Sequence, residues 1–271
     1  MPTPPHADAD PAPVVATGAR AAEPDAGLPV LRTVALSDPL RWLQRGWRDF
    51  AGAPGIGLFY GACFTTMGWM LRLLFEHAAV YTLAMSAGFL LVGPFLCLGL
   101  YEVNRRLEQG LRPSLWSSLW AWRRRGGTMA IFGAVLLIIE MLWARASLVV
   151  FALSFDGMPD FKGSVLALLD PQNLAFIVAY AGVGSVFAAL IFGISVVAMP
   201  MMLDRSTDAI TAGLTSLRLC LGQPGAMLCW GALITALVGM AMLPGFAGLL
   251  IVAPVLGHAS WHAYRACVMP A

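Results

Sequence analysis

Two similar stretches indicate the fold of this chain: FAGAPGIGLFYGACFT at residues 50–65 and CLGQPGAMLCWGALIT at residues 220–235. Each contains a G-x-P-G step that is followed by an apolar segment. Because Pro and Gly end helices and form turns, each stretch predicts a chain that turns into an apolar helix. At an offset of 170, nine of 29 positions in residues 38–66 are identical to those in residues 208–236, where chance would give about two.

The composition indicates that the apolar helices lie in a membrane. Of the 271 residues, 59% are hydrophobic and 12% are charged, whereas soluble domains have about 25% charged residues. Six apolar stretches each approach the ~20 residues that a helix needs to cross ~30 Å of hydrocarbon. They are residues 56–74, 79–101, 128–153, 173–202, 226–243 and 245–263. The sequence therefore predicts an all-α, polytopic membrane protein with six transmembrane helices.

The distribution of arginines predicts the orientation of these spans. Basic residues follow the second span, at Arg105, Arg106, Arg112, Arg123, Arg124 and Arg125. Acidic residues dominate after the third span, at Asp156, Asp160 and Asp170. Positive loops stay in the cytoplasm, so we expect both termini to be cytoplasmic and the 154–172 connection to lie outside, in a bacterial inner membrane.

About three amphipathic helices are expected at the cytoplasmic interface. In residues 38–52, one face is apolar and the opposite face is basic, with interfacial anchors at Arg41, Arg45, Arg48 and Trp47. Asp38 and Asp208 occupy N-cap positions of two such helices. A third helix in residues 113–127 has anchors at Arg123, Arg124 and Arg125.

An amphipathic helix followed by a helical hairpin describes three successive parts of the chain. The units cover residues 37–105, 113–205 and 206–265, and the second span of each carries one proline: Pro94, Pro200 and Pro254. Because all three have the same orientation, they would be parallel repeats within one transmembrane domain at residues 31–268. Residues 1–30 are rich in Pro, Ala and Asp and predict a disordered cytoplasmic tail.

Glu140 and Arg145 are the polar candidates inside a span, in the stretch LLIIEMLWAR. An ionisable group near the bilayer centre is costly and usually faces a partner or a cavity. One interpretation is an ion relay, a proton relay or a substrate contact. The other, which we favour, is a structural ion pair of Glu140 with Arg145 or with Arg72.

GHASWHAYR at residues 257–265 places His258 and His262 on one helical face. This spacing can hold a metal or an axial haem ligand. If the repeats superpose, Glu102, Asp204 and Asp208 would approach the same cytoplasmic mouth, and such a cluster could bind a divalent metal. Interfacial hydrogen bonding is the favoured interpretation, and no cofactor is predicted.

No other motif indicates chemistry. The five cysteines have no CxxC spacing, and a phosphate-binding loop, a nucleophile elbow and HExxH are all missing. We therefore expect a protein that is not an enzyme. The arginines suit orientation and anionic headgroups, so the expected partners are lipid and other membrane subunits, with no nucleic acid.

Three segments resemble a bacterial family of predicted integral membrane proteins, catalogued as domain of unknown function 2189. They are LRTVALSDPLRWLQRGWRDFAGAPGIGLFYG (31–61), GLYEVNRRLEQGLRPSLWSSLWAWRR (99–124) and APVLGHASWHAYR (253–265). The resemblance covers residues 28–268 and implies an inner-membrane location without any activity.

Three hypotheses for function follow from the sequence. The first is a non-enzymatic accessory, scaffold or assembly factor for a membrane complex, because few buried ionisable groups accompany many aromatic and small residues. The second is a small transporter or channel, which the repeats, the span prolines and Glu140 favour. The third is a metal- or haem-handling protein that uses His258 and His262.

Overall fold

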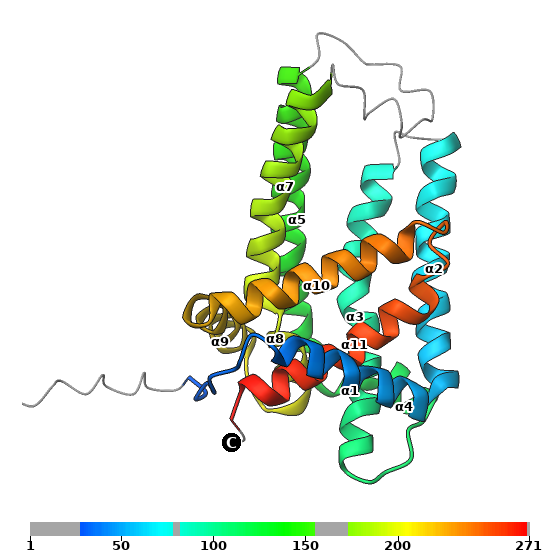
Figure 1. The fold of residues 1–271 in the computed structure, drawn as a ribbon, viewed down its shortest axis with the longest axis vertical. Helices are drawn as coiled ribbons and strands as arrows, with labels where there is room; N and C mark the ends of the chain where they lie inside the picture. The colour runs from blue at the N-terminus through cyan, green and yellow to red at the C-terminus, as the bar shows by residue number, and fades with distance from the viewer. Residues whose placement is uncertain (1–27, 78–81, 155–172, 270–271) are drawn as a thin grey trace, which may run out of the picture.

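The chain is described here by a computed structural model that covers residues 28–77, 82–154 and 173–269, and within these residues it is helical (Figure 1). α2, α3, α5 and α7 run along the long axis, and α10 and α11 cross obliquely beside them. The helices are α1 (Asp38–Gly52), α2 (Pro54–His77), α3 (Thr82–Glu108), α4 (Leu115–Leu119), the 3-10 helix η2 (Ala121–Arg125), α5 (Gly126–Ser154), α7 (Leu174–Ser195), α8 (Ala198–Asp204), α9 (Ala209–Gly222), α10 (Pro224–Met242) and α11 (Leu249–Cys267).

Four of these segments are long and apolar enough to cross a membrane: Pro54–His77, Gly126–Ser154, Leu174–Asp204 and Pro224–Met242. They correspond to four of the six expected spans. The other two expected spans, 79–101 and 245–263, correspond to the helices α3 and α11, which are not among the candidate spans. α11 carries two histidines and an arginine, and such side chains lower its mean hydropathy. The disordered tail and the 154–172 connection fall almost entirely outside the described residues.

The two G-x-P-G steps form the same turn. α1 ends at Gly52 and α2 begins at Pro54, while α9 ends at Gly222 and α10 begins at Pro224. The residue between each pair has nearly the same backbone angles: φ −141°, ψ 56° at Ala53 and φ −136°, ψ 57° at Gln223. Pro is favoured at the first position of a helix because it lacks the N–H that would be unpaired there. The sequence match therefore reflects a shared local structure.

The two expected N-caps differ. Asp208 caps α9, since its Oδ1 accepts from the backbone N–H groups of Ile210 and Thr211, both at 2.9 Å. Hydrogen bonds from the side chain and backbone of Thr211 lower the pKa of the Asp208 carboxyl. Asp38 is already inside α1, where its carboxylate accepts from Ala35 and Arg41.

The middle of the chain departs from the expected pattern. Residues 113–127 do not form one amphipathic helix, because α4 stops at Leu119 and a 3-10 turn, η2, follows. Gly126 then begins α5 directly after η2. The long fourth stretch breaks between Ser195 and Ala198, so Pro200 lies in the separate helix α8.

α11 is the central helix of the fold. Its residues from Pro254 to Ala259, and then Trp261, Ala263, Tyr264 and Cys267, are buried. Two glycines let neighbouring helices reach its backbone. A Cβ at Gly46 of α1 would lie 2.6 Å from Ala259 N and from Val255 O, and a Cβ at Gly61 of α2 would overlap the carbonyl of Leu250. Gly57 and Gly61 form a small-xxx-small pair, which predicts close helix packing, and the contact with α11 confirms this packing at Gly61.

The turn between α10 and α11 is fixed against α2. Gly245 and Phe246 have φ values of +62° and +67°, a region that glycine adopts readily and other residues rarely do. Trp69 of α2 donates its Nε1–H to Gly245 O at 2.6 Å, and the Phe246 ring covers Gly68. The hairpin tip consequently lies beside Trp69, well before the end of α2.

We predict that Gly61→Ala lowers the melting temperature of the detergent-purified protein, because the added methyl group collides with the α11 backbone. Overpacking of this kind costs about 1–3 kcal/mol. The matched control is Gly55→Ala on the same helix, where an added Cβ meets no atom within 4 Å. Equal melting temperatures for Gly61→Ala and wild type would show that α2 does not pack on α11 in this way.

Candidate functional site

The end of the bundle that carries α1, α4 and α8 (Figure 1) holds the ion pairs described below, and we call it the polar end. Glu102 of α3 is 1% exposed and is held by two arginines one turn further along its own helix. Arg105 Nη2 lies 2.8 Å from its Oε2, and Arg106 Nε lies 3.1 Å from its Oε1. A buried carboxylate needs such partners to remain charged, so Glu102 is occupied by structural ion pairs.

Asp204 of α8 belongs to a second set of contacts that joins α8 to α11. Tyr264 donates its hydroxyl hydrogen to Asp204 Oδ2 at 2.7 Å, and Arg265 Nη1 lies 3.3 Å from the same oxygen. Arg265 Nε also pairs with Glu108 of α3 at 3.2 Å. Trp261 donates its indole N–H to that glutamate at 3.0 Å. These bonds tie α3, α8 and α11 together where the helices end.

His258 is fully buried and bonds to α3 through Asn104. The Asn104 amide donates to the carbonyl of His258 at 3.0 Å, while its Oδ1 contacts His258 Nδ1. Because Oδ1 is an acceptor, Nδ1 carries the hydrogen and Nε2 has a lone pair. That Nε2 has no partner among the described residues.

His262 lies one turn further along α11 but faces a different partner. Its Nε2 lies 2.6 Å from Oδ2 of Asp49 in α1. The residues proposed as metal ligands, Glu102, Asp204, His258 and His262, thus occupy one end of the fold with separate partners. Across residues 28–77, 82–154 and 173–269, no group of three or more His, Cys, Asp or Glu side chains could hold a metal ion. The metal hypothesis gains no geometric support from these contacts.

Glu140 is buried in α5 at 6% exposure, and its Oε1 has no hydrogen-bond partner in the described structure. The hydroxyl of Ser147, seven residues later and therefore on the same helical face, is likewise buried without one. Neither arginine considered for Glu140 is shown pairing with it: Arg145 is exposed, and Arg72 pairs with Glu76 at 2.9 Å. Glu140 is therefore a buried carboxyl group without the ion pair that we favoured.

The interfacial anchors lie on the surface of the polar end. Arg41, Arg45, Arg48 and Trp47 are exposed on α1, where Arg41 pairs with Asp38 at 3.0 Å. In η2, the Arg123 guanidinium lies 4.3 Å from the centre of the Trp120 ring, and Arg125 donates to Ser206. The side chain of Arg124 lies outside the described part of the chain.

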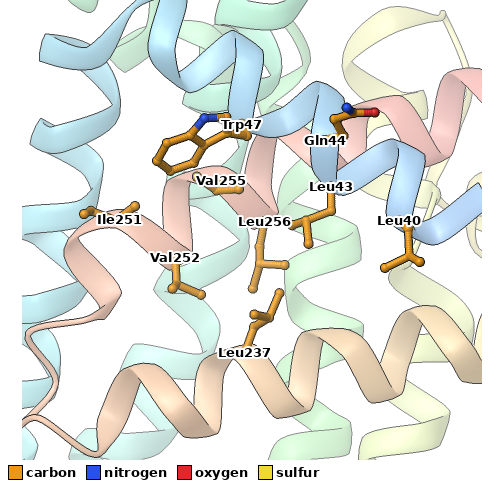
Figure 2. Close-up of a pocket in the computed structure, with 9 residues that line it drawn as sticks. All are labelled: Leu40, Leu43, Gln44, Trp47, Leu237, Ile251, Val252, Val255 and Leu256. Atoms are coloured by element: carbon orange, nitrogen blue, oxygen red, sulfur yellow. The ribbon is translucent and has the colours of Figure 1, made fainter.

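An apolar pocket that the sequence did not reveal lies between α1 and the α10–α11 hairpin (Figure 2). This α1 pocket has a volume of about 420 Å³, and Gln44 is the polar side chain in its lining. Leu40 and Leu43 point from α1 toward α10, and Leu256 of α11 lies between Leu43 and Leu237 of α10, with Val252 to one side. The apolar face of α1 was evident from its spacing, but the partner walls depend on the oblique course of α10.

Comparison with known proteins gives one match. No curated protein and no solved structure matches the chain. The matching family model covers residues 81–204, which extend from the start of α3 to the end of α8. Of the three resembling segments, residues 99–124 lie inside this range, so the match is shorter than the 28–268 that we expected. The model is that of the family described as "Predicted integral membrane protein (DUF2189)", and the match confirms the expected resemblance to that family.

Proposed function

We propose that this protein is a non-enzymatic accessory, scaffold or assembly factor that binds another transmembrane helix along α7. The observation that carries this proposal is an exposed face of mostly small residues, among which Val186 is 68% exposed. Ala175, Ala179, Gly182 and Ala189 are all exposed and follow one another at steps of four, three and seven residues. This spacing keeps them on one side of a helix, and small residues let helices approach closely in a membrane.

The same face is already a packing surface at its lower end. Gly193, four residues after Ala189, faces Leu217 of α9, and Phe192 lies against Gly231 of α10. Beyond this point α10 leaves α7 and runs toward α2 (Figure 1). The upper part of the face therefore stays open within the described structure. A helix from another protein could extend the packing that α9 and α10 begin.

We also propose that the chain crosses an inner membrane six times with both termini in the cytoplasm. The hairpin tip supports a full crossing by α10 and α11. It lies beside Trp69 and Arg72 of α2, residue types that mark the membrane–water interface. The matching turns at Ala53 and Gln223 support the proposed relation between the first and third units.

A second candidate function is transport of protons or another small ion. The observation that favours it is the buried carboxyl group of Glu140, whose Oε1 lacks a partner, with the hydroxyl of Ser147 two turns away on the same face. Ionisable side chains in such positions commonly mark ion pathways and proton relays. The glutamate would then gain and release the transported proton.

We predict that the protein extracted from its native membrane in mild detergent migrates on a native gel as a complex larger than its own 28.9 kDa. Ala179→Ile should weaken this complex on the order of tenfold, because a branched side chain clashes at a tight helix contact. Ala181→Ile is the matched control, since Ala181 is exposed on another side of the same helix. A protein that migrates alone at every expression level would contradict the accessory role.

The topology predicts which positions react with an impermeant maleimide on intact cells. With the native cysteines replaced, Leu243→Cys at the hairpin tip should react, because Leu243 is 83% exposed and would face outward. Gln109→Cys, exposed after α3, should react only after the membrane is made permeable. Labelling of Gln109→Cys in intact cells would reverse the proposed orientation.

The transport candidate predicts a proton flux into proteoliposomes that Glu140→Gln abolishes, since the amide cannot take up and release the proton. A pH-sensitive dye inside the vesicles measures this flux. Glu76→Gln should keep the flux, because Glu76 is exposed and pairs with Arg72 at the end of α2. If Glu140→Gln carries the wild-type flux, Glu140 has no part in transport, and if wild type carries none, this candidate fails.

A further inference from the structure

α1 has three faces: one is buried, one lines the α1 pocket, and one is basic. Trp42, Gly46 and Phe50 are buried, and Gly46 faces α11. The next face lines the pocket, with Leu40, Leu43, Gln44 and Trp47. The third face carries the arginines. Leu40 and Trp47 remain 60% and 52% exposed, so the pocket is open along this side of the helix.

Gln44 marks the border between the pocket and the arginines. Arg41 is three residues before Gln44 and Arg48 is four residues after it, so all three side chains lie along one strip of α1. Arg45 is four residues after Arg41 and three before Arg48, so it belongs to the same basic face but lies further from Gln44. Arg48 and Arg45 have no acidic partner among the described residues, whereas Arg41 pairs with Asp38. The strip therefore places positive charge at the open edge of an apolar cavity.

We propose that the α1 pocket binds an anionic phospholipid, with an acyl chain between α1, α10 and α11 and the phosphate against Arg41 and Arg48. The volume of about 420 Å³ falls within the ~300–1,000 Å³ range of ligand pockets. Ordered water is a poor occupant, because a single polar side chain in the lining offers few of the hydrogen bonds that water requires. An anionic phospholipid fits both parts of the site, because its acyl chain suits the apolar pocket and its phosphate suits the arginines at the edge.

The position of α1 favours a lipid over other apolar ligands. An amphipathic helix with Trp and Arg side chains lies in the headgroup region, with its apolar face toward the acyl chains. The pocket opens below that apolar face, between α1 and the membrane-crossing hairpin, where lipid is the abundant apolar molecule. This inference requires α1 to lie on a bilayer and is independent of the accessory role proposed for α7.

The test measures lipid binding to the full-length protein in mild detergent by native mass spectrometry, with dioleoyl phosphatidylglycerol and dioleoyl phosphatidylcholine as probes. The wild-type protein should bind phosphatidylglycerol more tightly. Arg48→Gln should weaken this binding roughly fivefold, because a basic residue near an anionic headgroup contributes about 1 kcal/mol. Arg123→Gln removes the same charge from η2, at the same end of the fold but outside the pocket lining, and should change binding by about twofold or less.

A second pair of variants tests the acyl-chain part of the site. Leu237→Trp fills the pocket from α10 and should abolish tight binding of both lipids. Leu228→Trp adds the same bulk on α10, where Leu228 is 72% exposed and outside the pocket lining, and should leave binding unchanged. Equal losses for Arg48→Gln and Arg123→Gln would overturn the headgroup assignment. If Leu237→Trp still binds both lipids tightly, the pocket assignment is wrong. The same conclusion follows if Leu237→Trp changes the oligomeric mass of the protein but leaves lipid binding unchanged.

A measurement on the wild-type protein covers the case in which Leu237→Trp does not fold. Phosphatidylglycerol with a diazirine on one acyl chain is bound in the dark and then irradiated. Peptide mapping should find the label on the α11 residues that line the pocket, at Val252 and Leu256, and competition by unlabelled phosphatidylglycerol should remove it. Labelling spread evenly over the exposed surfaces of α5 and α7 would contradict a specific site.

Discussion

The contact between the backbone of α11 and the two helices α1 and α2 controls the arrangement of everything around it. Gly46 and Gly61 supply this contact, because any larger side chain would meet the α11 backbone. With lipid as the surrounding solvent, burial of apolar surface does little to drive helices together, and close backbone packing has to contribute instead. α11 is thereby held at the centre, although its composition is less apolar than that of the candidate spans.

The central position of α11 also explains where the polar groups lie. His258, Trp261, Tyr264 and Arg265 reach α3 and α8 through hydrogen bonds and ion pairs. His262 reaches α1 through Asp49. These residues therefore act as connectors between helices at the polar end. What remains available for function lies elsewhere: the small-residue face of α7, the buried Glu140 of α5 and the α1 pocket.

Much of the local structure could be predicted from the sequence, because it depends on residues close together in the chain. The G-x-P-G steps predicted both helix turns, Asp208 caps α9 as expected, and the tight packing of Gly61 followed from its small-residue motif. Features that depend on distant segments could not be predicted. The pairing of His262 with Asp49 joins residues 213 apart in sequence, and the α1 pocket requires the oblique course of α10. The prediction of one amphipathic helix at 113–127 was wrong. Residues 121–125 form a 3-10 helix that packs against α3, α5 and α8, and the hydrophobic periodicity of the sequence does not reveal this packing.

Hydrogen–deuterium exchange of the wild-type protein in lipid nanodiscs tests the central role of α11 most directly. The last three turns of α11, residues 258–267, lie at the same end of the fold as α4 and α9 but are mostly buried. Burial and stable packing slow the exchange of backbone amides, so these amides should exchange far more slowly than those of α4 and α9. If residues 258–267 exchange as fast as those two helices, α11 is a peripheral helix and the arrangement described above is wrong.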